Sequence, residues 1–176
     1  SIVWSLHQPT GLVSDYASMG IALSSSGRLA YVYQWGGELR AAIYRFGGTV
    51  PGLDALQRCY PYGDDDRRRT EPDIAAASWG QREVVVEVHR SRTWILDYGL
   101  YCNVGTRNEG TDYIAWGPDI QYDEGTQPSV AMNTPGDTVE VHKSRDEDTL
   151  WYHVGYVDWY ERRMQWGPSI KYDNGK

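Results

Sequence analysis

The feature that most limits the fold of this chain is an internal repeat with a period of about 50 residues. Three sequence blocks occur twice, in the same order along the chain. WGPDIQYDEG is followed by WGPSIKYDNG, VEVHRS by VEVHKS, and LYCNVG by LWYHVG, at residues 116–125 and 166–175, 86–91 and 139–144, and 100–105 and 150–155. Because all three blocks recur in order, the chain is predicted to be an array of similar supersecondary units.

A third, degenerate copy lies upstream. The chain is therefore divided into a short leading segment and three repeats. Residues 1–16 carry an isolated strand-like stretch around Trp4. The repeats are predicted to cover residues 17–71, 72–127 and 128–176. The first repeat is degenerate because its closing block keeps a tyrosine and an aspartate but has lost the tryptophan.

Each repeat is predicted to form four short strands. In the third repeat, strands are expected at residues 129–132, 138–142, 150–157 and 162–170. A turn at residues 134–137 is expected to join the first two strands. The second strand alternates, with Val139 and Val141 on one face. No segment shows a sustained apolar period of 3.6 residues. The sequence therefore predicts an all-β array of roughly 12 or 13 strands.

Composition narrows the functional classes. The chain has 14 tyrosines and 8 tryptophans but one phenylalanine, and large aromatics with a polar edge are typical of half-buried strands and polar binding surfaces. A net charge of −7 argues against nucleic acid and anionic membranes as partners. Residues 1–10 lack a signal-peptide pattern, so we expect a cytosolic or already processed protein. Cys59 and Cys102 are expected to be two buried thiols or one disulfide.

The blocks VEVHKS and WGPSIKYDNG resemble tandem repeats of bacterial and some fungal lectin-like proteins, which also occur appended to phospholipase-like enzymes. The resemblance is close over residues 72–176 and weak over residues 17–71. It implies a β-propeller-like fold and a binding role. Three repeats are too few for a propeller of about four to eight blades, so subunits are expected to combine their repeats in a homo-oligomer. A β-trefoil, closed within one chain by three four-stranded repeats, is the alternative.

Repetition also marks candidate binding residues, because a repeated binding module repeats its site whereas an enzyme carries a unique one. Ser91 and Ser144 are one repeated polar pair. The repeated pairs taken as candidate ligand-binding residues are Tyr122 and Tyr172, Asp123 and Asp173, His89 and His142, and Trp116 and Trp166. An aspartate accepts hydrogen bonds from sugar hydroxyls, and an aromatic ring stacks on the apolar face of a pyranose. Each pair also has a structural interpretation, in which the aspartates cap turns, the aromatics fill space between repeats, and the histidines bond a neighbouring repeat.

We therefore predict a non-catalytic lectin with one shallow site per repeat, which binds glycans or glycoconjugates. A structural or protein–protein interaction module is the alternative. A glycosidase is less favoured, because Glu87 and Glu140 are repeated and expected to face outward. No cofactor or metal is expected, because His153 falls at a repeat position unrelated to His142 and completes no zinc-ligand set. The acidic runs at residues 64–66 and 146–148 are expected to be solvated loops, and the arginines at residues 67–69 are expected to neutralise the first run.

Overall fold

The structure is a computed structural model, and it describes residues 19–35, 38–45, 57–58, 68–79, 82–92, 98–108 and 113–173. These residues form 14 strands and include no helix, hence none that is long and apolar enough to cross a membrane. The predicted all-β class is confirmed. The predicted strand around Trp4, and Cys59, lie outside the described residues.

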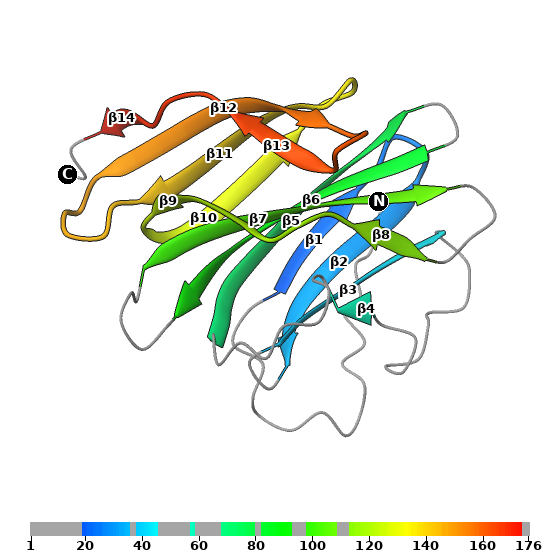
Figure 1. The fold of residues 1–176 in the computed structure, drawn as a ribbon, viewed down its shortest axis with the longest axis horizontal. Helices are drawn as coiled ribbons and strands as arrows, with labels where there is room; N and C mark the ends of the chain where they lie inside the picture. Colours follow the sequence, from blue (N-terminus) through cyan, green and yellow to red (C-terminus); the bar gives the residue numbers. More distant parts are fainter. Residues whose placement is uncertain are drawn as a thin grey trace, which may run out of the picture.

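The strands form three antiparallel sheets, which we call sheets A, B and C (Figure 1). Sheet A contains β1 (Met19–Leu23), β2 (Arg28–Trp35), β3 (Glu38–Arg45) and β4 (Gln57–Arg58). Sheet B contains β5 (Arg68–Trp79), β6 (Arg82–Arg92), β7 (Gly99–Asn108), β8 (Ile114–Trp116) and β9 (Ile120–Glu124). Sheet C contains β10 (Thr126–Met132), β11 (Asp137–Lys143), β12 (Leu150–Asp158), β13 (Arg163–Trp166) and β14 (Ile170–Asp173). In each sheet the strands lie side by side in chain order.

The closing strand is broken in both sheet B and sheet C. β8 and β9 both pair with β7, and β13 and β14 both pair with β12. The single strand predicted over residues 162–170 is therefore wrong, and the break falls at Gly167, whose amide bonds the Val154 carbonyl before a proline that has no amide hydrogen. Trp166 lies directly opposite Gly155, where a Cβ would come within 2.8 Å of the indole ring. The repeated tryptophan–glycine–proline block thus shapes the sheet.

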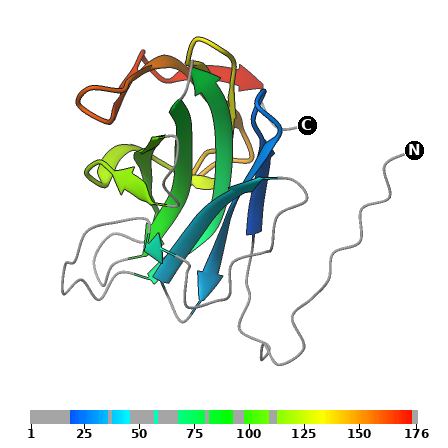
Figure 2. The same cartoon turned by 90° about the vertical axis from the view of Figure 1, so that its right-hand side faces the viewer.

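The sheets stack in order, with sheet B between the other two (Figures 1 and 2). One core joins sheets A and B through apolar side chains such as Val32, Ile43 and Ile74, and a second joins sheets B and C through Val86, Val104 and others. Every strand pairing among the described residues joins strands from the same stretch of the chain, which is residues 19–58 in sheet A, 68–124 in sheet B and 126–173 in sheet C. A β-trefoil closes its barrel by pairing strands of different repeats, so the trefoil alternative does not describe this chain.

Among the residues that the structure describes, sheet C is covered on one face only, and the covered face differs from what its alternation suggests. Val139 and Val141 share a face of β11, as predicted, but this is the open face, where they are 38% and 37% exposed. The alternate residues of the same strand, Thr138, Glu140 and His142, are buried against sheet B. Polar side chains therefore lie between the sheets while valines face outward.

Candidate functional site

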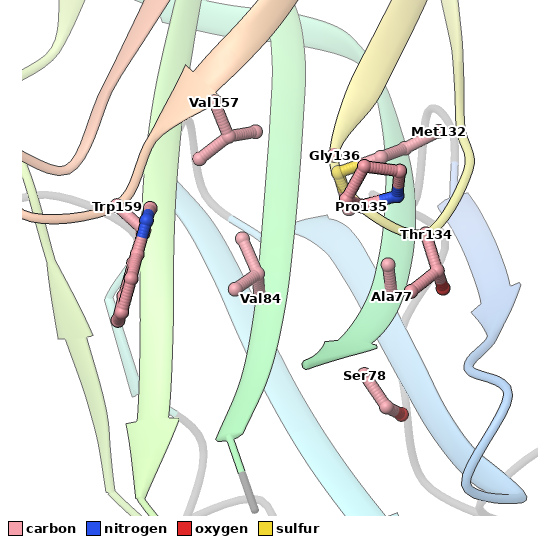
Figure 3. Close-up of a pocket in the computed structure, with 9 residues that line it drawn as sticks. All are labelled: Ala77, Ser78, Val84, Met132, Thr134, Pro135, Gly136, Val157 and Trp159. Carbon is pink, nitrogen blue, oxygen red and sulfur yellow. The ribbon is translucent and has the colours of Figure 1, made fainter. Parts of the chain in front are cut away.

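Two hollows lie at opposite ends of the junction between sheets B and C. The first is an apolar gap (Figure 3) lined by Ala77, Ser78, Val84, Met132, Thr134, Pro135, Gly136, Val157 and Trp159. Its free volume is about 10 Å³, which is room for one water molecule at most. This gap is a packing defect between the sheets and cannot hold a ligand.

The second hollow is an open, polar pocket of about 290 Å³. It is lined by Asp123, Glu124, His142, Ser144, Arg145, Asp146, Trp151 and Ser169. The first two belong to β9 of sheet B, and the others come from sheet C, where β11 ends, β12 begins and the closing strand is broken. The loop between β11 and β12 is closed by a backbone bond from the Ser144 amide to the Thr149 carbonyl at 2.8 Å.

The rim of the pocket is held by contacts around one tryptophan and one arginine. The Trp151 indole donates to the Thr149 hydroxyl at 3.0 Å, which fixes the plane of the ring. Arg145 pairs with Glu124 at 3.4 Å and with Asp146 at 3.3 Å. The same guanidinium lies 4.9 Å from the centroid of the Tyr98 ring. These contacts place an aromatic ring, a cation and carboxylates around one open space.

The floor of the pocket is a buried cluster of two histidines and two carboxylates. His142 Nδ1 lies 3.0 Å from Glu140, and His142 Nε2 lies 3.5 Å from Asp123 Oδ2. His153 Nδ1 donates to the Gly167 carbonyl at 3.0 Å, and its Nε2 lies 2.7 Å from the same Asp123 oxygen. Asp123 reaches the cluster from sheet B, so the cluster spans the junction.

Asp123 is already committed to protein partners. Its Oδ1 accepts the Glu124 amide at 2.7 Å, and its Oδ2 faces His153. Burial alone would raise the pKa of Asp123. Hydrogen bonds from His153, Ser169 and the Glu124 amide, together with the His142 charge, outweigh the effect of burial, so the pKa of Asp123 is lowered. The carboxylate is therefore ionised and occupied, and it is a poor acceptor for sugar hydroxyls.

Sheet B contains a similar buried cluster, in which Asn103 stands at the repeat position of His153. His89 Nδ1 lies 3.1 Å from Glu87, and Asn103 donates to both Glu87 and Asp119. Arg69 Nη2 pairs with Asp119 at 3.1 Å. One expectation is wrong here, because Glu87 and Glu140 are fully buried instead of facing outward. Arg69 is buried as the ion-pair partner of Asp119.

The residues predicted from the repeat have different environments in the two copies. Tyr122 packs 5.4 Å from the Trp166 ring between sheets B and C, and burial, followed by the Glu140 charge, raises the pKa of its phenol well above the usual value. Tyr172, its repeat equivalent, is 72% exposed, and Asp173 beside it is also exposed. The structure brings only Asp123 and His142 of the predicted set together in the pocket.

The other predicted positions lie away from the pocket and have structural contacts. His89 is fully buried and stacks on Tyr101 with centroids 5.8 Å apart. Trp116 packs against the core between sheets A and B. Trp166 packs between sheets B and C, and its indole donates to the sulfur of Cys102, a free thiol whose pKa burial raises to about 12.

Sequence reasoning marked Ser144 as a repeated polar position but missed His153, Arg145, Trp151 and Ser169. His153 stands in a repeated block, but its counterpart in the second repeat is an asparagine, so repetition did not mark it. The others lie next to repeated positions and differ between copies or face a loop. The signal that could have found His153 is the departure from the repeat, since a histidine replaces asparagine at a buried strand position.

Comparison with known proteins defines the fold only. No protein-family model matches the chain, and no curated protein matches it either. Among solved structures, a mutant of the NanB sialidase from Streptococcus pneumoniae has a TM-score of 0.52 and 17% identity over 89% of this chain. A xylan β-1,4-xylosidase from Bacillus halodurans has a TM-score of 0.51 and 10% identity over 92% of the chain. The chain spans 23% and 32% of the lengths of these two proteins.

Proposed function

We propose that this chain is a non-catalytic carbohydrate-binding protein, a lectin, whose site is the open pocket between sheets B and C. The observation that carries the proposal is the pocket itself, about 290 Å³ of polar space with the Trp151 ring in its lining. Small-ligand sites combine a concave surface with a few placed polar groups. A flat surface suited to another protein does not need such a hollow.

Recognition of a sugar follows from the groups on the rim. Trp151 supplies an apolar face for the C–H side of a pyranose ring. The Arg145 guanidinium donates hydrogen bonds to sugar oxygens, and the Asp146 carboxylate accepts them from hydroxyls, both as charge-assisted bonds. Ser144 adds a hydroxyl that both donates and accepts. These residues replace Asp123 as the ligand-binding set, since the oxygens of Asp123 face protein partners.

The pocket belongs to the third repeat, and we propose one site there in place of one site per repeat. In sheet B, Arg69 and Asp119 form an ion pair at the corresponding cluster, where sheet C has the pocket floor. The carboxylates on the pocket rim also fit binding better than catalysis. Glu124 and Asp146 are solvent-exposed and both contact Arg145, whereas a glycosidase needs one carboxylic acid kept protonated in a secluded place.

The fold likeness supports a carbohydrate role without assigning a sugar. The two solved structures that resemble this chain are a sialidase and a xylosidase by name. Their identity to this chain is low, so the choice of ligand rests on the pocket. Glycan-array profiling identifies the ligand, and turnover of a panel of chromogenic glycosides by the same preparation would show that the chain is an enzyme instead.

Replacing Trp151 with alanine is expected to weaken glycan binding about tenfold or more, because the stacked ring supplies on the order of 1.4 kcal/mol of binding free energy. Titration calorimetry with the best array ligand measures the change, and about one site per chain is expected. Tyr160→Ala is the matched control, since Tyr160 is 79% exposed and lies outside the pocket. Equal affinity of Trp151→Ala and wild type would place the site elsewhere.

We further propose that the sheets act as propeller-like blades and that a second copy of the chain covers sheet C. On sheet B the side chains of Val86, Val88 and Val104 are buried under sheet C. Their repeat equivalents on sheet C include Val154, which is 55% exposed. This face of sheet B packs against sheet C, so the equivalent outer face of sheet C is suited to pack against a similar sheet of a second copy.

The opposite end of the array offers the complementary surface. Ile21 and Leu23 of β1 are 46% and 55% exposed, while Gly20 between the sheets lies against β5. Exposed apolar side chains at both ends of a stack are typical of an interface that repeats head to tail. Two copies supply six sheets, within the usual range of about four to eight blades.

Replacing Val154 with aspartate is expected to prevent this association, because it places a charge in the centre of the apolar face. Light scattering coupled to size-exclusion chromatography should show a dimer for the wild-type chain and a monomer for the variant. The control is Tyr113→Asp, a 64% exposed position next to β8 of sheet B and outside this face. A wild-type chain that is monomeric at about 100 μM would contradict the dimer, since stable interfaces bind more tightly.

A further inference from the structure

The pocket floor brings together three side chains of the types that bind transition metals. One nitrogen each from His142 and His153 and one oxygen from Asp123 lie within 4.8 Å of one another. Two imidazoles and a carboxylate form a ligand set suited to zinc. We infer that this cluster is a binding site for a zinc-type divalent metal ion. The inference does not depend on whether the pocket binds a glycan.

The hydrogen bonds at Nδ1 of both histidines leave Nε2 as the ring atom that faces a metal ion. The Gly167 carbonyl only accepts hydrogen bonds, so His153 carries a proton on Nδ1. The Glu140 carboxylate holds the proton of His142 on Nδ1 in the same way. Carboxylates and backbone carbonyls play this orienting role behind metal-bound histidines. The Nε2 atoms of both rings therefore face Asp123, and a metal ion bound there would displace the Nε2 proton that His153 donates to Asp123 in the metal-free protein.

The cluster of sheet C has a glycine where the cluster of sheet B has an arginine. In sheet B the two buried carboxylates of the equivalent cluster are accompanied by the Arg69 guanidinium. Strand register places Gly125 of sheet C at the position of Arg69, since Thr126 pairs with Lys143 as Thr70 pairs with Arg90. Glycine supplies no cation. A metal ion in sheet C would supply the charge that an arginine supplies in sheet B.

The distances are close to those of a tetrahedral site. Zinc bonds of about 2.0–2.1 Å place neighbouring ligand atoms about 3.3 Å apart. His142 Nε2 and Asp123 Oδ2 are already 3.5 Å apart, and His153 Nε2 lies 2.7 Å from the same oxygen. Side-chain rotations that move the ligand atoms by about an ångström would bring all three atoms to these distances. The fourth position opens toward the pocket, which both Asp123 and His142 line.

A metal at this place would join two sheets. Asp123 belongs to β9 of sheet B, and both histidines belong to sheet C. Because the ion binds the folded junction and not the unfolded chain, it stabilises the fold by mass action. Zinc is thus expected to raise the melting temperature of the chain, and this effect requires ligands from both sheets.

Zinc binding by the metal-free, full chain tests the inference. Calorimetric titration with zinc chloride, with bound zinc counted by mass spectrometry after dialysis, should give one ion per chain with a Kd of about 1 μM or lower. Asp123→Asn and His153→Asn should each weaken binding at least about a hundredfold, because a side chain that binds the metal directly is lost. His153→Asn introduces the residue that sheet B has at this position, so it suits the fold.

Asp173→Asn is the matched control, since Asp173 is the exposed repeat equivalent of Asp123, and its zinc affinity should equal that of the wild type. Should a variant fail to fold, cobalt(II) binding to the wild-type chain decides, because nitrogen and oxygen ligands in a tetrahedral site give visible absorption without a thiolate band. No saturable zinc binding below about 100 μM, or wild-type affinity in both folded variants, would overturn the inference.

Discussion

Replacing Arg69 with methionine is expected to lower the free energy of unfolding by about 3–5 kcal/mol, because it leaves a buried carboxylate without its cation. Arg69 contacts Asp119 through both Nη2, at 3.1 Å, and Nε, at 3.4 Å, and the two side chains are 5% and 14% exposed. Asn103 joins Asp119 to Glu87 in the same network. Urea unfolding followed by tryptophan fluorescence measures the change.

Two further variants show whether the loss comes from the unpaired charge. Adding Asp119→Asn to the Arg69 variant should recover part of the lost stability, because it removes the unpaired charge. Arg145→Met is the control, since Arg145 is half exposed and its ion pairs at the pocket rim are worth less than about 1 kcal/mol. Equal losses for Arg69→Met and Arg145→Met would show that the buried pair has no special role.

Replacing Val104 with aspartate is expected to cost more than about 4 kcal/mol and to leave little folded protein, because it buries an unpaired charge between sheets B and C. Val104 is 1% exposed. Val154 stands at the same position of the next repeat and is 55% exposed. The aspartate variant at Val154 should therefore keep the stability of the monomer within about 1 kcal/mol.

This pair of substitutions compares one sequence position in two tertiary environments. Circular dichroism melts of both variants at a concentration low enough to avoid association measure the difference. Similar losses of stability at Val104 and Val154 would mean that the outer face of sheet C is covered within the monomer, which would also contradict the proposed role of that face in association.

The sequence by itself determined the local architecture. The repeat and the alternation of apolar residues specify antiparallel strands that follow one another across each sheet. The turn predicted at residues 134–137 forms because Asn133 accepts the Gly136 and Asp137 amides, and Gly136 adopts a φ of 115° that glycine tolerates. These features depend on residues close together in the chain, so spacing and residue type are sufficient to predict them.

Part of the candidate site was also visible from sequence. Asp123 and His142 were marked by repetition, and the structure places both in the pocket. Repetition could not show that Tyr122 is packed between sheets while Tyr172 is exposed, because the two have the same sequence context. The difference arises from the next sheet, which covers sheet B and is absent over sheet C among the described residues.

Which faces are covered, and which residues meet across sheets, depends on how the sheets pack. A period of two shows that Val139 and Val141 share a face, but it contains no information on what packs against that face. The cluster of Asp123, His142 and His153 joins residues of two sheets, and no spacing along the chain encodes that contact. The physical reason is that burial and electrostatic pairing depend on the neighbouring sheet, whereas sequence periodicity reports only the geometry of the strand itself.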